Sequence, residues 1–244
     1  MLLIEIKYAI AAYLRRSADE LIVNSVDLSL IALNEVRKEA ELENDFGFSR
    51  KLMTVPVSGS VGGSLDEAVV MGTDTHLEVR SIIDVGLFDE FGNLNPVEWT
   101  SVAESMRRQR EENPLYGIRY PTDAQAVIGP LGQRRFTFAG DDIYVFPRTQ
   151  DTTVTFTLGF EAFTFTPDWT VGDINSEQEM GPWTKHGHQY LLWASVIRVN
   201  KLFQEFVPRQ EGNLAEPSDL ATAGLEKFKT WDTYKYEGTR THGR

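Results

Sequence analysis

The chain has 244 residues, of which 41% are hydrophobic, and this length and composition favour a globular protein with a sizeable core. It contains no cysteine, which excludes disulfides, thiolate metal sites and a cysteine nucleophile. The 24 basic and 36 acidic residues give a formal net charge of −12. Because sequence-independent binding to DNA relies on Lys and Arg, this charge disfavours tight binding of nucleic acid.

The beginning of the chain is apolar but is interrupted by Glu5 and Lys7, and we expect it not to be a signal peptide. No apolar run approaches the roughly 20 residues that a membrane-spanning helix needs. We therefore expect a soluble protein that is made in the cytosol, with no membrane partner.

Residues 1–48 are predicted to be helical. Apolar side chains recur at helical spacing in the first helix, and a second helix is predicted to begin at the capping-box spacing of Ser17 and Glu20, or near Asn24. The apolar face of the second helix runs from Val26 to Ala40. Its opposite face is predicted to be solvated and carries Glu35, Lys38, Glu39, Glu41 and Asp45.

The pattern changes to that of strands after about Ser49. Strands are predicted at 52–57 and 75–85, and 135–138 and 143–146 are predicted to pair around a turn at 139–142. Two further strands are expected at 153–158 and 161–166, with a bend near Gly159. A short polar helix is expected at 104–112.

Helical spacing returns after Thr170. A long helix is predicted at 188–206 and is ended by Pro208, and a final helix opens at Pro217 and buries Leu225, Phe228 and Trp231. The fold class is therefore α+β, with a central antiparallel β insertion. Residues 1–48 and 171–236 are predicted to pack into one discontinuous helical domain, 49–170 to form the β-rich insertion, and 237–244 to be a flexible tail.

No constellation of catalytic residues is visible, so we expect no enzyme, no cofactor and no metal. His186 and His188 are the strongest metal candidates, but residues two apart diverge on a helix, and His76 and His242 are distant in sequence. Asp141 and Asp142 are better explained as turn residues than as an acid–base pair. For the Arg-rich run at 107–110, a solvated helix face is favoured over a phosphate site.

Three stretches resemble the adaptor family of head-to-tail connectors, or necks, in tailed bacteriophages. They are Val26–Glu41 with Asn44-Asp45-Phe46 after it, Tyr190–Ile197 continuing through Phe206 to Leu214, and Trp231-Asp232-Thr233-Tyr234. The resemblance implies a structural subunit that forms a homo-oligomeric ring, commonly dodecameric, below the portal protein. It also implies contacts with tail or nozzle proteins, passage of duplex DNA without tight binding, assembly in the host cytoplasm and a final place in the virion.

The resemblance directs attention to two sets of residues. A ring needs two different patches that meet on neighbouring copies, and we assign Arg209, Gln210 and Glu211 to such an inter-subunit contact. Residues 225–244 combine a charge of +2 with aromatic side chains, which often anchor interfaces. The hypothesis is that portal docking uses Trp231, Tyr234, Lys235, Tyr236, Arg240 and Arg244.

Two alternatives stay open at the level of the sequence. The C-terminal aromatic residues could simply complete the packing of the last helix. The whole chain could instead be a β-rich binding module of a virion or cell surface that recognises a glycan or a protein partner through its insertion.

Overall fold

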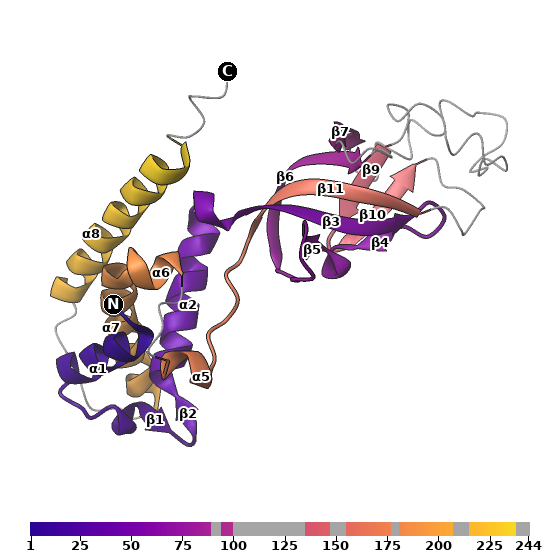
Figure 1. Ribbon diagram of the computed structural model, residues 1–244. Helices are drawn as coiled ribbons and strands as arrows, with labels where there is room; N and C mark the ends of the chain where they lie inside the picture. The colour runs from indigo at the N-terminus through magenta and orange to yellow at the C-terminus, as the bar shows by residue number, and fades with distance from the viewer. Residues whose placement is uncertain (89–93, 100–134, 147–154, 177–180, 207–214, 238–244) are drawn as a thin grey trace, which may run out of the picture. The chain divides into compact units, whose positions relative to one another are not determined.

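The computed structural model describes the chain except for residues 89–93, 100–134, 147–154, 177–180, 207–214 and 238–244 (Figure 1). Helices and largely antiparallel sheets are both present, so the α+β class is confirmed. The chain divides into a helical unit, Met1–Ser49 with Thr166–Arg244, and a β unit, Arg50–Phe165. The sequence predicted these two domain boundaries between residues 48 and 49 and between residues 170 and 171.

The helical unit is built from both ends of the chain. Its N-terminal elements are α1 (Leu3–Tyr13), η1 (Asp19–Leu21), β1 (Ile22–Val23), β2 (Val26–Asp27), α2 (Leu28–Glu43) and η2 (Gly47–Ser49). Its C-terminal elements are α5 (Val171–Ile174), α6 (Pro182–Lys185), α7 (His188–Phe206), α8 (Ala215–Asp232) and η5 (Thr233–Glu237).

The second helix begins later than predicted. Ser17 and Glu20 do form reciprocal hydrogen bonds, but these close the short turn η1. A two-stranded hairpin follows, and α2 then begins at Leu28. Just before it, the carboxylate of Asp27 accepts a hydrogen bond from the backbone N–H of Ser29 at 3.0 Å. Asp27 is therefore the N-cap of α2, because its carboxylate accepts first-turn N–H groups that have no partner within the helix.

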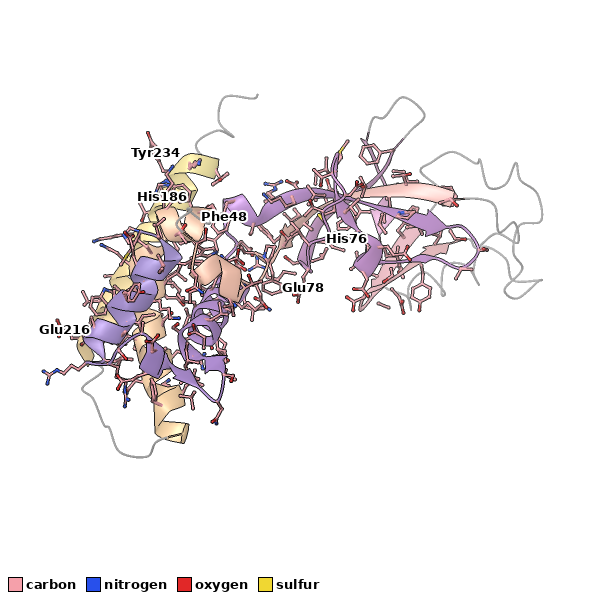
Figure 2. All side chains as sticks on the ribbon, turned by 60° about the horizontal axis from the view of Figure 1, so that its bottom comes forward. Phe48, His76, Glu78, His186, Glu216 and Tyr234 are labelled. Carbon is pink, nitrogen blue, oxygen red and sulfur yellow. The ribbon has the colours of Figure 1, made fainter. Side chains whose placement is uncertain are left out.

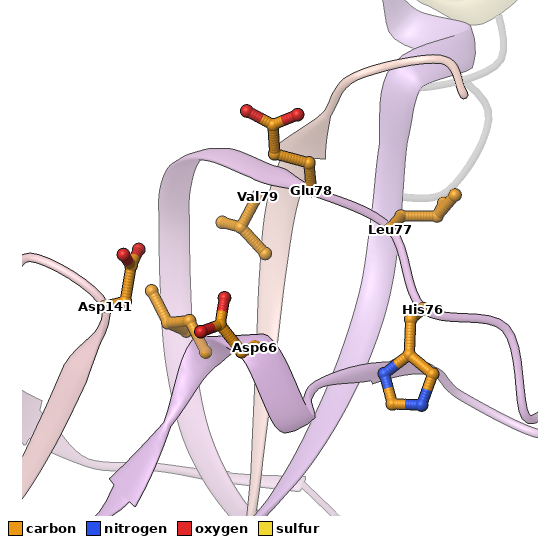
Figure 3. A pocket seen from close by; sticks show the side chains of 7 residues that line it. Asp66, His76, Leu77, Glu78, Val79 and Asp141 are labelled. Atoms are coloured by element: carbon orange, nitrogen blue, oxygen red, sulfur yellow. The ribbon is translucent and has the colours of Figure 1, made fainter. Parts of the chain in front are cut away.

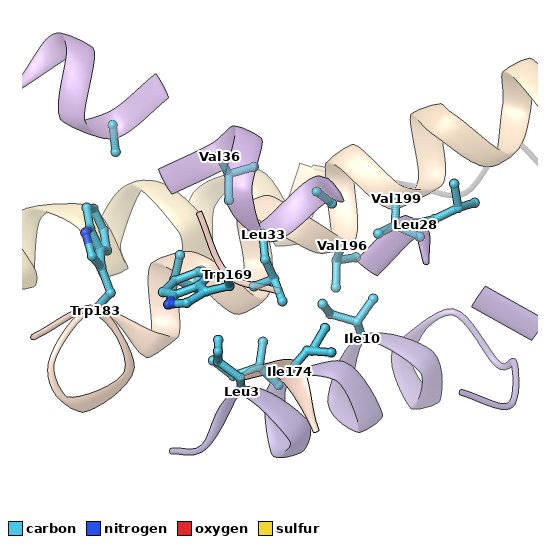
Figure 4. Packing of buried hydrophobic residues seen from close by; sticks show 14 of the residues in the cluster. Leu3, Ile10, Leu28, Leu33, Val36, Trp169, Ile174, Trp183, Val196 and Val199 are labelled. Atoms are coloured by element: carbon cyan, nitrogen blue, oxygen red, sulfur yellow. The ribbon is translucent and has the colours of Figure 1, made fainter. Parts of the chain in front are cut away.

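The core of the helical unit lies among α1, α2 and α7, with contributions from the segments before and after the insertion (Figure 4). Leu3 and Ile10 of α1, Leu33 of α2 and Val196 of α7 are fully buried. Apolar faces from the two ends of the chain thus share one core, which neither end could form alone.

Polar residues of α2 hold the chain where it returns from the β unit. Asn34 donates to the carbonyl of Trp169 and accepts from its N–H, each at 2.9 Å. Glu41, predicted to be solvated, is only 1% exposed. Its carboxylate accepts from the Trp183 indole N–H at 2.7 Å, from the Thr166 N–H at 3.0 Å and from the Thr166 hydroxyl. The prediction for Glu41 was wrong because the returning segment covers this face.

Arg37 lies between these two residues on the same face of α2. Its fully buried guanidinium donates to the Pro167 carbonyl and to the Asp168 carboxylate, the latter at 2.7 Å. It also lies 4.7 Å from the ring centre of Trp169. Burial lowers the pKa of Arg37, and the carboxylates of Glu41 and Asp168 oppose that shift. These contacts explain why 166–170 belong to the helical unit rather than to the insertion.

The β unit contains two sheets. One has the order β5 (Val69–Val70), β3 (Arg50–Ser58), β11 (Thr155–Thr164), β6 (Val79–Phe88) and β7 (Leu94–Pro96). The other has the order β4 (Gly63–Ser64), β10 (Asp142–Phe146), β9 (Arg135–Ala139) and β8 (Glu98–Trp99). Alternate residues of β3 and β11, such as Val55 and Leu158, point into a shared core.

The predictions for the hairpin of the second sheet and for strand β11 of the first sheet had different outcomes. The hairpin is confirmed, since Ala139 pairs with Asp142 across a two-residue turn in which Gly140 has φ = 63°. The predicted bend at Gly159 was wrong, because β11 runs through it without interruption and pairs Gly159 with Thr54 and Gly86. The expected helix at 104–112 lies outside the described residues.

Candidate docking site

The last turns of the helical unit carry the candidate site. Helix α8 ends at Asp232, and the chain continues as one turn of π-helix, η5. Turns of this kind are rare and are often found at functional sites. Figure 2 shows Tyr234, His186 and Phe48 at the same end of the helical unit, although they come from three distant parts of the sequence.

Trp231 is embedded in a stack of rings. Its indole lies parallel to Phe228, with ring centres 5.6 Å apart, and on the imidazole of His186, with centres 3.9 Å apart. Phe228 is fully buried. Trp231 therefore joins α8 to the end of α6, as the packing alternative predicted, and its partly buried ring stabilises the fold.

Asp232 fastens the same turn to η2. The residue is 5% exposed, and its carboxylate accepts the N–H of Gly47 at 2.6 Å and that of Phe48 at 3.3 Å. Hydrogen bonds from N–H groups to an ionised carboxylate are stronger than those between neutral groups. The end of α8 is thereby held to a segment 185 residues away in the sequence.

Tyr236 completes the contact with η2. A Cβ atom placed on Gly47 would lie 2.4 Å from Tyr236 Cβ, so only glycine allows this approach. The Tyr236 ring also meets Trp231 edge-on, with centres 6.1 Å apart. Burial, followed by the nearby Asp232 carboxylate, raises the pKa of Tyr236, which keeps the phenol neutral.

Tyr234 and Lys235 face outward from the turn. Tyr234 is 86% exposed, which is unusual for so large an aromatic side chain. Lys235 is also exposed, and its ammonium lies 5.1 Å from the ring centre of Trp231 and 5.4 Å from that of Tyr236. The surface of the turn therefore combines an aromatic ring with a positive charge, which suits an acidic and partly apolar partner.

The structure separates the residues that the sequence grouped for docking. Trp231 and Tyr236 pack inward, whereas Tyr234 and Lys235 point outward. Arg240 and Arg244 lie outside the described residues, as do the inter-subunit candidates Arg209, Gln210 and Glu211.

The metal hypothesis gains no support from the histidines. His186 stacks on Trp231, and His188 opens α7. In the part of the chain that the structure describes, no group of three or more acidic or histidine side chains could hold a metal ion. None of the described helices is long and apolar enough to cross a membrane.

The β unit contains a separate acidic pocket of about 440 Å³ (Figure 3). Asp66, His76, Glu78 and Asp141 line it together with three apolar residues. The Nδ1 atom of His76 lies 3.1 Å from the carbonyl oxygen of Ala68. Asp141 stands in the hairpin turn, as predicted, and also faces this pocket.

Sequence reasoning missed the role of Asp232, because its partners are backbone N–H groups that carry no side-chain signal. It also missed the stripe of polar residues on α2. Asn34, Arg37 and Glu41 share one helical face by their spacing of three and four residues, and that interruption of an apolar face was a usable signal.

Comparison with known proteins leaves the family open. No protein-family model matches the chain, and no curated protein matches it.

Proposed function

We propose that the chain is a structural adaptor subunit of a phage head-to-tail connector, which forms a ring that joins the portal protein to the tail. The observation that carries the proposal is the turn η5, which displays Tyr234 and Lys235 on a helical unit built from both ends of the chain. A turn that is anchored at its base and exposed at its tip suits attachment to a partner protein.

The role in the virion follows from the resemblance of three sequence stretches to the adaptor family. The ring assembles in the host cytoplasm and stays in the neck of the virion, between the portal and tail or nozzle proteins. The net charge of −12 on each copy suits a channel that duplex DNA passes without sticking, because negative groups repel phosphates. No catalytic residue is part of the proposal.

Native mass spectrometry of the full chain, alone and with purified portal protein, tests the assembly. We expect a homo-oligomer or a complex with the portal, and electron microscopy should show a ring. A chain that stays monomeric under both conditions would refute the adaptor function.

Variants of the full chain separate the two parts of the predicted docking segment. Tyr234→Ala should weaken attachment to portal-containing particles about tenfold or more, which is typical of a central aromatic anchor. A chain that ends at Glu237 removes Arg240 and Arg244 without touching the packed residues. If this shorter chain attaches with unchanged affinity, the arginines do not take part.

A second candidate is the β-rich binding module that recognises a glycan or a protein. The pocket with Asp66, His76 and Glu78 favours it, because carboxylates and imidazoles can accept and donate hydrogen bonds to sugar hydroxyls. Binding of the full chain to a glycan array, lost in Glu78→Gln and accompanied by a monomeric mass, would favour the module over the adaptor.

A further inference from the structure

The exposed tip of η5 stands between two anchored residues. Asp232 precedes Tyr234 by two positions and Tyr236 follows it by two, and both contact Gly47. Thr233, Tyr234 and Lys235 between them are exposed. The backbone on either side of Tyr234 is therefore held against η2, while its side chain stays in solvent.

Asp232 is the polar element of this anchorage. Its carboxylate takes two successive N–H groups of η2, those of Gly47 and Phe48, and is itself buried. Phe48 in turn packs on Trp183 and Phe228, whose ring centres lie 6.0 Å and 5.7 Å from its own. The hydrogen bonds thus tie the turn to a segment that is packed in the aromatic core rather than to a surface loop.

We propose that Asp232 is a positioning residue for docking, which acts by holding Tyr234 in the orientation that the partner recognises. This inference rests on the proposed function. Binding normally costs free energy because loops and side chains must be ordered at the interface, and a preordered turn reduces that cost. Asp232 itself, being buried, does not meet the partner.

A double-mutant cycle on the full chain tests this role, with immobilised portal-containing particles that lack tails as the probe. In Asp232→Asn the carboxamide nitrogen cannot accept an N–H, so one of the two hydrogen bonds to η2 is lost. We expect weaker attachment and faster amide exchange at Gly47 and Phe48. In this background Tyr234→Ala should cost less than about threefold in affinity, against about tenfold in the native chain.

The reduced effect of Tyr234→Ala is the readout that a purely structural role would not produce. Asp219→Asn makes the same chemical change at an exposed position of α8 and serves as the matched control. Gly47→Ala is a second variant, which displaces Tyr236 without any change of charge and should give the same non-additivity. If Asp232→Asn does not fold, as judged by circular dichroism, Gly47→Ala decides the question.

The outcomes separate the two proposals. Additive effects of Asp232→Asn and Tyr234→Ala would overturn the positioning role while leaving docking through Tyr234 intact. If Tyr234→Ala attaches normally in the native background, the docking function of the turn fails instead. Amide exchange of 233–237 in Asp232→Asn then still decides the anchorage: unchanged exchange would contradict it.

Discussion

Removal of the buried carboxylate of Glu41 should strongly destabilise the helical unit. Glu41→Ala leaves the Trp183 indole N–H and two donors of Thr166 without their acceptor in a site that is 1% exposed. It also removes the negative charge that offsets the cost of burying the Arg37 guanidinium. Each unsatisfied donor costs about 1–3 kcal/mol, and loss of one partner of a buried charge costs about 3–5 kcal/mol. Because these costs overlap, we expect a loss of about 4 kcal/mol in the free energy of unfolding.

Urea unfolding followed by tryptophan fluorescence measures this loss in the unit concerned. Of the five tryptophans, Trp169, Trp183, Trp193 and Trp231 lie in the helical unit, so the signal reports chiefly on its unfolding. Glu43→Ala, two residues along α2 and exposed, is the matched control and should change stability by less than about 0.5 kcal/mol. If Glu41→Ala is no more destabilised than Glu43→Ala, the carboxylate does not hold the returning segment.

Four further predictions concern packing, pH, architecture and charge. Gly224→Ala should lower the free energy of unfolding in urea by about 1–3 kcal/mol, because its Cβ would lie 2.8 Å from the backbone nitrogen of Tyr190. Thr222→Ala, at an exposed position of the same helix, should not lower it. Burial, followed by the Glu43 carboxylate, raises the pKa of Tyr190 to about 12. The stability that the neutral phenol contributes is therefore complete below a pH of about 10, and it is lost as the pH rises through about 12. Urea midpoints over this range should fall less in Tyr190→Phe, and an equal fall would contradict the shift. A chain in which a short linker replaces Arg50–Phe165 should keep a helical circular dichroism spectrum, and an unfolded product would show that the helical unit cannot stand alone. Duplex DNA at low salt should bind the purified chain no more tightly than micromolar, and tight binding with a steep salt dependence would refute the proposed passive channel.

Local patterns in the sequence were enough for the fold class, for the longest helix and for one hairpin. The helical spacing of apolar residues predicted 188–206, and α7 has those bounds. The alternating pattern around 139–142 predicted the hairpin of β9 and β10. Such elements are predictable because their periodicity repeats over many residues and depends only on which face is buried.

Elements that depend on distant partners were not predictable in the same way. The sequence placed a bend at Gly159, but pairing with β3 and β6 on both sides keeps β11 continuous through this residue. The sequence also placed Glu41 in solvent, because a single helix does not show that Thr166 and Trp183 will cover its polar face. Both outcomes result from contacts between residues that are more than 70 positions apart.

The candidate site shows the same division. Composition, together with the resemblance to the adaptor family, indicated the aromatic and basic residues of the C-terminal segment, since their chemical types are independent of the fold. Which of them pack inward and which face solvent was decided by the tertiary structure, through the hydrogen bonds of Asp232 to Gly47 and Phe48. A carboxylate that binds backbone N–H groups needs no particular partner side chain, so only the folded chain brings them together.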